Sequence, residues 1–135
     1  MSSTTREVFW LAATTAMTSV FWVPYILNRM RERGIFKALW DPHGETQADA
    51  AWADRMMRAH KNAVENLCVF APLVLLVAQT GVSSSQTASA AMIYFFARLG
   101  HFIVFTLGLP LIRVLHFLVG FFCQAVLAAA VFGWT

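Results

Sequence analysis

The chain has 135 residues, of which 59% are hydrophobic, and its mean hydropathy is +0.61. This composition excludes an ordinary water-soluble domain and is typical of a small protein with several membrane spans. The net charge is +3, and the placement of the charges is more informative than their sum. No nucleic-acid partner is expected. Cys68 and Cys123 both lie in apolar runs, so we expect packed thiols rather than a disulfide framework or a metal site.

Four apolar stretches predict four transmembrane helices. In chain order they cover about residues 8–27, 55–81, 88–109 and 111–134, and each reaches the roughly 20 residues that a crossing helix needs. The first stretch has no strongly positive start and no clear cleavage site, so we expect a retained span rather than a removed signal peptide. The sequence therefore predicts one all-α membrane domain over residues 1–135, a four-transmembrane-helix bundle.

Three prolines mark irregular points in these helices. Pro24 lies near the end of the first span and Pro72 lies within the second. Both are expected to kink or loosen their helices, which membrane bundles tolerate. Pro110 lies between the third and fourth stretches and predicts a tight turn there.

Basic residues predict the orientation of the chain. The connection between the first two spans is surrounded by Arg29, Arg31, Arg33, Lys37, Arg55 and Arg58, and Arg113 lies beside the third connection. By the positive-inside rule, these two connections are cytoplasmic and both termini are outside. Because the chain shows no retention signal or long tail, we expect a bacterial inner (cell) membrane rather than an organelle.

The second span carries polar residues into the membrane. Its apolar part, residues 66–81, is too short to cross alone, so the helix must begin near Arg55 and take Arg58, Asn62 and Glu65 below the headgroups. At about 100° per residue, these four side chains fall within one arc of roughly 80°. Lys61 lies at the edge of this arc and His60 lies elsewhere. Ionisable groups at this depth are costly and mark functional sites.

The third and fourth spans add further positive charge. Arg98, His101 and Phe105 have the spacing i, i+3, i+7, so they share one helix face. Arg98 needs a partner inside an apolar span, and Glu65 is the expected one. Arg113 lies near the cytoplasmic end of the fourth span. This surplus of positive charge around one carboxylate favours an anionic ligand. The alternative is that the polar groups only hold the helices together.

These residues resemble the MAPEG family, the membrane-associated proteins of eicosanoid and glutathione metabolism. The resemblance rests on RAHKNAVEN at residues 58–66, on RLGH at residues 98–101, and on the P-x-x-R of residues 110–113. It points to bacterial-type members similar to microsomal glutathione transferase. It implies a four-helix protomer that assembles as a homotrimer, with glutathione bound between neighbouring subunits near the cytoplasmic side.

The resemblance also implies roles for individual residues. Arg113 matches an arginine near the glutathione thiol and is the implied catalytic residue. The second and third spans supply the other contacts, and one arginine of the first span contributes as well. The implied glutathione-binding residues are Arg58, Lys61, Asn62, Glu65, Arg98 and His101, with Arg29 or Arg33 from the first span.

Two positions depart from the family pattern. Phe105 stands where glutathione-using members usually carry a tyrosine, and Val114 follows Arg113 where some members carry a serine. The phenol and hydroxyl that could assist the thiol are therefore missing. The family also contains members that bind lipids without catalysing a reaction.

The resulting hypothesis is a membrane-bound glutathione transferase that acts on lipophilic electrophiles and also reduces hydroperoxides. Glutathione would be the co-substrate, and the cation of Arg113 would favour its thiolate. One alternative is a non-catalytic module that binds a lipid or a partner protein. The other is a small proton-coupled transporter built around Glu65, which the surplus of arginine disfavours because like charges would repel a cationic substrate.

Overall fold

The computed structural model describes residues 5–41, 44 and 47–134, and helices dominate them. The helices are α1 (Arg6–Val20), α2 (Val23–Arg33), α3 (Ile35–Leu39), α4 (Ala51–Thr80), α5 (Ser85–Leu107) and α6 (Pro110–Val131). Four segments are long and apolar enough to cross a membrane: Arg6–Arg33, α4, α5 and α6. The prediction of four spans is therefore confirmed, with boundaries shifted by a few residues.

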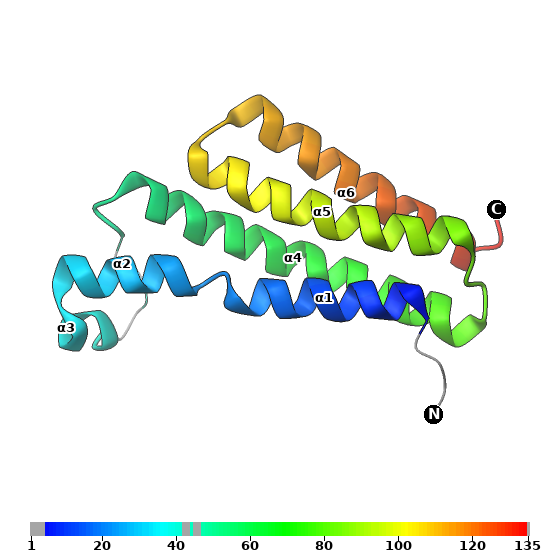
Figure 1. The fold of residues 1–135 in the computed structure, drawn as a ribbon, viewed down its shortest axis with the longest axis horizontal. Helices are drawn as coiled ribbons and strands as arrows, with labels where there is room; N and C mark the ends of the chain where they lie inside the picture. Colours follow the sequence, from blue (N-terminus) through cyan, green and yellow to red (C-terminus); the bar gives the residue numbers. More distant parts are fainter. Residues whose placement is uncertain (1–4, 42–43, 45–46, 135) are drawn as a thin grey trace.

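The long helices lie side by side and run up and down in turn (Figure 1). α1 and α6 each pack against both α4 and α5. The end that holds α2, α3 and the start of α4 also holds the α5–α6 turn, and the opposite end holds the start of α1 and the end of α6. The predicted basic connections therefore share one end of the bundle.

The three prolines have different effects. α1 ends at Val20 and α2 begins at Val23, so the first span is broken just before Pro24, which cannot donate a backbone hydrogen bond. Pro110 is the first residue of α6, where a missing N–H costs nothing. Both agree with the predictions. Pro72, in contrast, lies inside α4, which continues as a helix from Ala51 to Thr80.

Stacked aromatic rings and small residues form the core. The rings of Phe70 (α4) and Tyr94 (α5) stack with centroids 3.7 Å apart, among buried residues that include Ala90 and Ala91. Phe21, at the break in the first span, stacks on Phe102 of α5, also at 3.7 Å. Small side chains let membrane helices approach closely, so these rings fill the space that remains between the helices.

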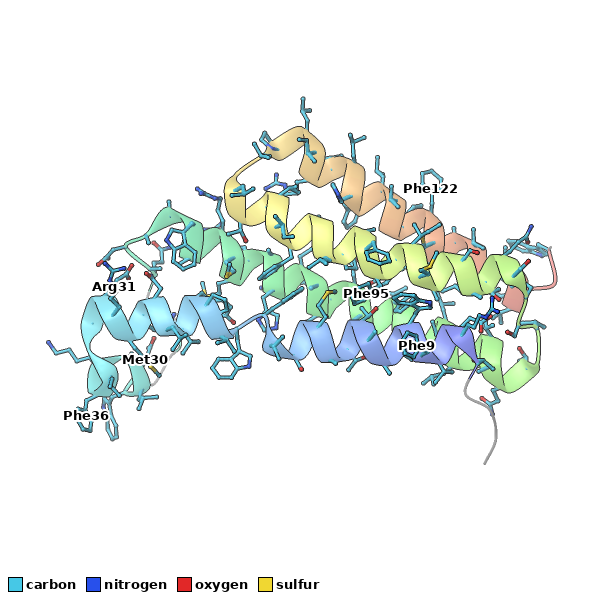
Figure 2. All side chains as sticks on the ribbon, in the orientation of Figure 1. Phe9, Met30, Arg31, Phe36, Phe95 and Phe122 are labelled. Carbon is cyan, nitrogen blue, oxygen red and sulfur yellow. The ribbon has the colours of Figure 1, made fainter. Side chains whose placement is uncertain are left out.

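The outer surface is apolar, as a lipid-facing surface must be. Phe9 of α1 and Phe122 of α6 project away from the bundle (Figure 2), with 58% and 64% of their surface exposed. A soluble monomer rarely exposes so much contiguous apolar surface. The distribution of side chains therefore agrees with a bundle that is surrounded by lipid.

One buried carboxylate was not predicted. Glu7 of α1 is fully buried, and its Oε1 accepts hydrogen bonds from Ser83 Oγ at 2.7 Å and Thr87 Oγ1 at 2.5 Å. Glu65 is therefore not the only acidic residue in a span. Glu7 precedes the apolar stretch of the sequence by one residue, so hydropathy placed it outside the helix. It ties α1 to the α4–α5 turn.

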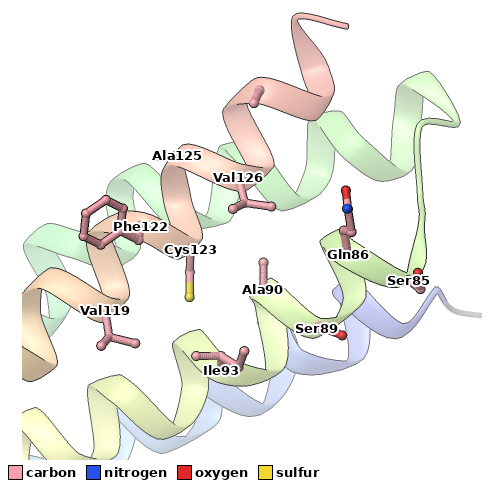
Figure 3. A pocket seen from close by; sticks show the side chains of 11 residues that line it. Ser85, Gln86, Ser89, Ala90, Ile93, Val119, Phe122, Cys123, Ala125 and Val126 are labelled. Carbon is pink, nitrogen blue, oxygen red and sulfur yellow. The ribbon is translucent and has the colours of Figure 1, made fainter. Parts of the chain in front are cut away.

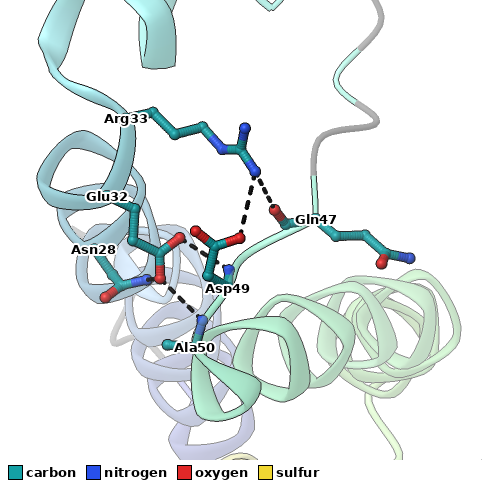
Figure 4. Close-up of polar contacts among 6 residues, drawn as sticks. All are labelled: Asn28, Glu32, Arg33, Gln47, Asp49 and Ala50. Atoms are coloured by element: carbon teal, nitrogen blue, oxygen red, sulfur yellow. Dashed lines mark hydrogen bonds and ion pairs between the residues drawn. The ribbon is translucent and has the colours of Figure 1, made fainter.

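Glu32 ties the end of the first span to the start of the second (Figure 4). Its carboxylate accepts hydrogen bonds from Asn28 Nδ2 at 2.7 Å, from Ala50 N at 2.9 Å and from Asp49 N at 3.0 Å. Ala50 is the N-cap of α4 and has no capping side chain. Glu32 therefore supplies from α2 the acceptor and the negative charge that a helix N-terminus favours.

We expect Glu32→Ala to loosen this junction. Loss of the carboxylate leaves the backbone N–H groups of Asp49 and Ala50 without their acceptor, so hydrogen exchange at these amides should become faster and the melting temperature should fall. Arg31→Ala, an exposed change on the same helix, is the control and should alter neither. Unchanged exchange at Asp49 and Ala50 in Glu32→Ala would contradict the capping role.

Candidate functional site

Arg98 is a buried cation in the interior of the bundle. Only 2% of its surface is exposed, and it lies about 14 Å along α5 from Leu107, at 1.5 Å per residue. Its Nη2 donates a hydrogen bond to Asn62 Oδ1 of α4 at 2.6 Å. Its Nε and Nη1 are also buried, and neither has a hydrogen-bond partner in the described part of the chain. The guanidinium thus keeps two donor atoms available.

The predicted pairing of Arg98 with Glu65 is wrong. Asn62 is the partner instead, and Glu65 is exposed. Three residues of helix turn the side chain by about 300°, so Glu65 points some 60° away from Asn62. The ion pairs among the described residues are Arg29–Asp41, Arg33–Asp49 and Arg58–Asp54. The buried charge of Arg98 is therefore not balanced by a carboxylate in contact with it.

Phe105 lies between His101 and Arg113. His101 is buried, with 3% of its surface exposed, and its ring meets that of Phe105 edge to face with centroids 5.6 Å apart. The guanidinium carbon of Arg113 lies 4.5 Å from the centre of the Phe105 ring, a distance at which a cation is attracted to an aromatic face. The predicted shared face of Arg98, His101 and Phe105 is thus present, and Arg113 of α6 joins it.

Arg55 fixes the turn that precedes Arg113. Its Nε donates a hydrogen bond to the carbonyl oxygen of Thr106 at 2.8 Å. Its guanidinium covers Gly108, where a Cβ atom would lie only 3.3 Å from Arg55 Cζ. Gly108 also has φ +78°, a conformation that favours glycine. Arg55, which the sequence placed on the polar face of α4, therefore holds the α5–α6 turn against the start of α4.

The remaining polar residues of α4 lie on its open surface. Arg58 is exposed, and its Nε lies 3.0 Å from Asp54 Oδ2. Lys61 and Glu65 are exposed and line a surface hollow of about 410 Å³ together with residues that include Tyr25 and His60. The predicted arc of α4 is therefore divided: Arg55 and Asn62 face α5, whereas Arg58 and Glu65 face outward.

His60 faces α2, away from the polar arc, as its position in the helical repeat predicted. Its Nδ1 lies 2.9 Å from the hydroxyl oxygen of Tyr25. This contact joins α4 to the first span beside the surface hollow.

The two arginines of the first span contact the first connection. Arg29 Nη1 lies 3.6 Å from Asp41 Oδ2, and both side chains are largely buried. Arg33 Nη2 lies 3.6 Å from Asp49 Oδ1 and donates a hydrogen bond to the carbonyl oxygen of Gln47 at 3.2 Å (Figure 4). In this protomer both side chains stabilise the loop that leads to α4.

α6 contributes two residues that the sequence analysis missed. Gly120 is buried, and a Cβ atom there would lie 3.6 Å from Arg98 Cδ and 3.7 Å from the Tyr94 ring. Gln124 Nε2 donates a hydrogen bond to the carbonyl oxygen of Asn66 at 3.2 Å. A glycine and an amide within the apolar second half of α6 are the available sequence signals, because small and polar residues mark helix contacts in membranes.

An apolar hollow lies away from these basic residues. It has a volume of about 840 Å³ and opens between α5 and α6, where Cys123 points into it (Figure 3). Ile93, Val119 and Phe122 form part of its apolar lining, and Ser89 adds a hydroxyl. Cys123 is about 15 Å along α6 from Arg113 at 1.5 Å per residue. The groove suits an acyl chain or another apolar molecule rather than an anion.

Comparison with known proteins identifies the family. A family model described as "MAPEG family" matches residues 8–133, whereas no curated protein matches the sequence. The match covers nearly the whole chain and agrees with the four membrane spans. It confirms the resemblance inferred from the motifs. The chain is therefore a multi-pass integral membrane protein that belongs to the MAPEG family, whose members are linked to glutathione or eicosanoid metabolism.

Proposed function

We propose that this protein is a membrane-bound glutathione transferase of the microsomal, bacterial type, which joins glutathione to lipophilic electrophiles and also reduces lipophilic hydroperoxides. The observation that carries the proposal is the environment of Arg98. Its guanidinium is buried, contacts a neutral amide, and keeps two donor atoms unpaired. A buried charge without a counter-charge is costly, so an anionic ligand would stabilise this arrangement.

Glutathione suits the site because it carries carboxylates. A guanidinium presents its donors in a planar fork that matches a carboxylate, and such pairs are among the strongest hydrogen bonds in proteins. The hydrogen bond that Arg98 Nη2 donates to Asn62 Oδ1 fixes the orientation of the fork. The family is linked to glutathione, which makes this anion the best supported of those with carboxylates.

Arg113 is the residue proposed to activate the thiol. It lies in the first turn of α6, where the helix N-terminus adds positive potential to that of the guanidinium. A cation near a thiol favours the thiolate, which is the reactive nucleophile. The thiolate sulfur would form a bond to the electrophilic carbon while the leaving group departs with its electron pair. The thiol proton passes to water.

The exposed residues of α4 support a site that is completed by assembly. Arg58, Lys61 and Glu65 lie on the open surface of one protomer. In the proposed homotrimer they would face a neighbouring copy, with Glu65 binding the α-amino group of glutathione and the two cations binding a carboxylate. Arg29 or Arg33 would take part only after exchanging its contacts with Asp41 or Asp49 for the ligand.

The proposed orientation brings both substrates to the site. With the basic end of the bundle in the cytoplasm of a bacterial cell and both termini outside, glutathione would arrive from the cytoplasm at the α5–α6 turn. The lipophilic substrate would arrive sideways from the bilayer. Holding the two together lowers the entropic cost of the reaction.

One observation favours a second candidate function, a non-catalytic lipid-binding protein. The apolar groove between α5 and α6 has a volume of about 840 Å³, and the side chains of Phe105 and Val114 cannot donate a hydrogen bond to a thiolate. Tight retention of lipid through purification, together with no glutathione binding, would support it. The proton-coupled transporter is disfavoured, because Glu65 and Lys61 line the same hollow and Lys61 would repel a cation.

We expect Arg98→Met to weaken glutathione binding strongly without unfolding the protein. The variant removes an unbalanced buried charge but keeps a long side chain, so its melting temperature should not fall. In calorimetric titrations of reduced glutathione into detergent-purified protein, affinity should fall at least about tenfold, equivalent to about 1.4 kcal/mol. Arg31→Gln removes an exposed charge and is the matched control. Wild-type affinity in Arg98→Met would refute the anion site.

Arg58→Ala tests the outer residues of the same site. Because Arg58 is exposed and contacts only the neighbouring turn through Asp54, the fold should be retained. Glutathione affinity should decrease, but by less than in Arg98→Met, since a solvated cation contributes less than a buried one. Equal affinity in Arg58→Ala and wild type would remove this residue from the site.

Arg113→Gln should lower the rate of conjugation at neutral pH by about tenfold, the effect of a shift of one unit in the thiol pKa. Loss of the cation raises the pKa of bound glutathione, so the thiolate fraction falls at pH 7 and recovers at higher pH. The pH–rate profile with a standard electrophile at saturating glutathione should therefore shift to higher pH. A profile that keeps its wild-type position would show that Arg113 does not act on the thiol.

Phe105→Tyr should raise the conjugation rate. The phenol keeps the aromatic ring that holds Arg113 and adds an O–H donor for the thiolate. Phe105→Leu is the comparison, since it loses the ring and should lower the rate. The rates of both variants, measured at saturating glutathione, test the interpretation. A slower Phe105→Tyr enzyme would mean that the site has no room or use for the hydroxyl.

A further inference from the structure

The short helix α3 carries large apolar side chains that the protein does not cover. Phe36 projects away from the four long helices (Figure 2) and has 89% of its surface exposed, and Trp40 has 86% exposed. Ile35 and Leu39 are exposed by 60% and 68%. Together these four residues form the α3 patch. Ala38, less exposed, is the remaining small apolar residue of the helix.

The α3 patch is held in place at both ends. Gly34, with φ +81°, ends α2 and reverses the chain, and its N–H donates a hydrogen bond to the Met30 carbonyl oxygen at 2.9 Å. At the other end Asp41 pairs with Arg29 of α2, and these side chains are only 14% and 12% exposed. The patch is therefore a preformed surface, because two α2 contacts fix the helix that bears it.

The depth of α3 places the patch at the edge of the bilayer. The first span has 28 residues and is about 42 Å long at 1.5 Å per residue, whereas the hydrocarbon core is about 30 Å thick. The last turns of α2 therefore emerge among the headgroups. α3 packs against α2 and folds back beside its end (Figure 1). The patch thus lies near the boundary between headgroups and acyl chains.

Two basic residues lie close to the patch in the sequence, Arg31 on α2 and Lys37 on α3. Arg31 and Lys37 are exposed, and neither forms an ion pair within the described part of the chain. Among the described residues, Asp41 pairs with Arg29, and Glu32 binds the start of α4. Exposed cations beside aromatic and aliphatic side chains are typical of segments that lie in a membrane surface rich in anionic lipid.

We propose that α3 is an in-plane membrane anchor, which inserts the α3 patch at the headgroup boundary of the leaflet on this side and binds anionic phospholipids through Arg31 and Lys37. Tryptophan favours this interfacial depth. The position of α3, its apolar side chains and the nearby charges together favour the bilayer as the surface that covers the patch. A neighbouring copy of the chain is the other surface that could cover the patch.

Quenching of Trp40 tests the insertion. The wild-type protein and Trp40→Phe are placed in phospholipid nanodiscs, and the difference between their emission spectra isolates the fluorescence of Trp40. We expect this component to be quenched strongly by lipids brominated on the acyl chains. Quenching by aqueous acrylamide instead would show that Trp40 lies in water. Protection from both quenchers would show that protein covers it. Either result overturns the proposal.

A second comparison tests the preference for anionic lipid. Brominated phosphatidylglycerol should quench the Trp40 component about twice as strongly as brominated phosphatidylcholine at the same fraction of the lipid. The reason is that the positive charges of Arg31 and Lys37 enrich anionic lipid nearby. In the variant Arg31→Gln/Lys37→Gln, the two lipids should quench equally. Equal quenching of the wild-type protein by the two lipids, or a preference that remains in the variant, would show that Arg31 and Lys37 do not bind anionic phospholipids.

Discussion

The burial of Arg98 opposite a neutral amide is the constraint on which the candidate site depends. A guanidinium keeps its proton at physiological pH, so Arg98 cannot avoid the cost of burial by becoming neutral. Asn62 satisfies one donor, and the other two buried nitrogen atoms have no hydrogen-bond partner among the described residues. Breaking a buried ion pair is costly because it leaves one charge without its partner. The charge of Arg98 is in this state before any ligand binds. Binding of an anion would recover part of the free energy that burial of this charge costs. Under the proposed function, the empty protein is therefore less stable and the ligand binds more tightly.

The surrounding packing keeps the guanidinium in one position. Three helices meet there: α4 supplies Asn62, α5 supplies Arg98, and α6 supplies Gly120, which lies beside the arginine stem. The turn after α5 is fixed separately, because Arg55 donates to the Thr106 carbonyl oxygen and covers Gly108. Arg113 follows this turn closely and lies over the ring of Phe105. Since α5 carries both Arg98 and Phe105, the positions of the two arginines depend on the same helix. Any change in the α4–α5 contact would therefore move both of them.

Much of this arrangement was predictable from the sequence. The physical basis of those predictions also explains which features could not be predicted. Long apolar runs reveal the spans, and the helical repeat places His101 and Phe105 on one face of their helix and His60 away from the polar arc, as the structure shows. The repeat gives directions but not neighbours, so it could not decide between Asn62 and Glu65 as the partner of Arg98. Glu7 was missed because hydropathy treats a charged residue beside an apolar run as the end of the span. The role of Glu32 depends on backbone amides of Asp49 and Ala50, which no side-chain pattern reveals.

The two ends of the bundle differ in a way that gives the site a direction. At the end that holds the start of α1, Glu7 is fully buried, and its Oε1 is bound by Ser83 and Thr87, whereas its Oε2 has no hydrogen-bond partner among the described residues. This end therefore holds a buried carboxyl group. At the other end, the polar face of α5 continues from Arg98 through His101 to Phe105, and Arg113 lies over that ring. Positive charge along this route attracts an anion and repels a cation. Arg113 thus lies at the same end as α3 and α2, so an anionic ligand, if it binds as proposed, would meet these charges from that end, while the long apolar faces leave the sides of the bundle to lipid.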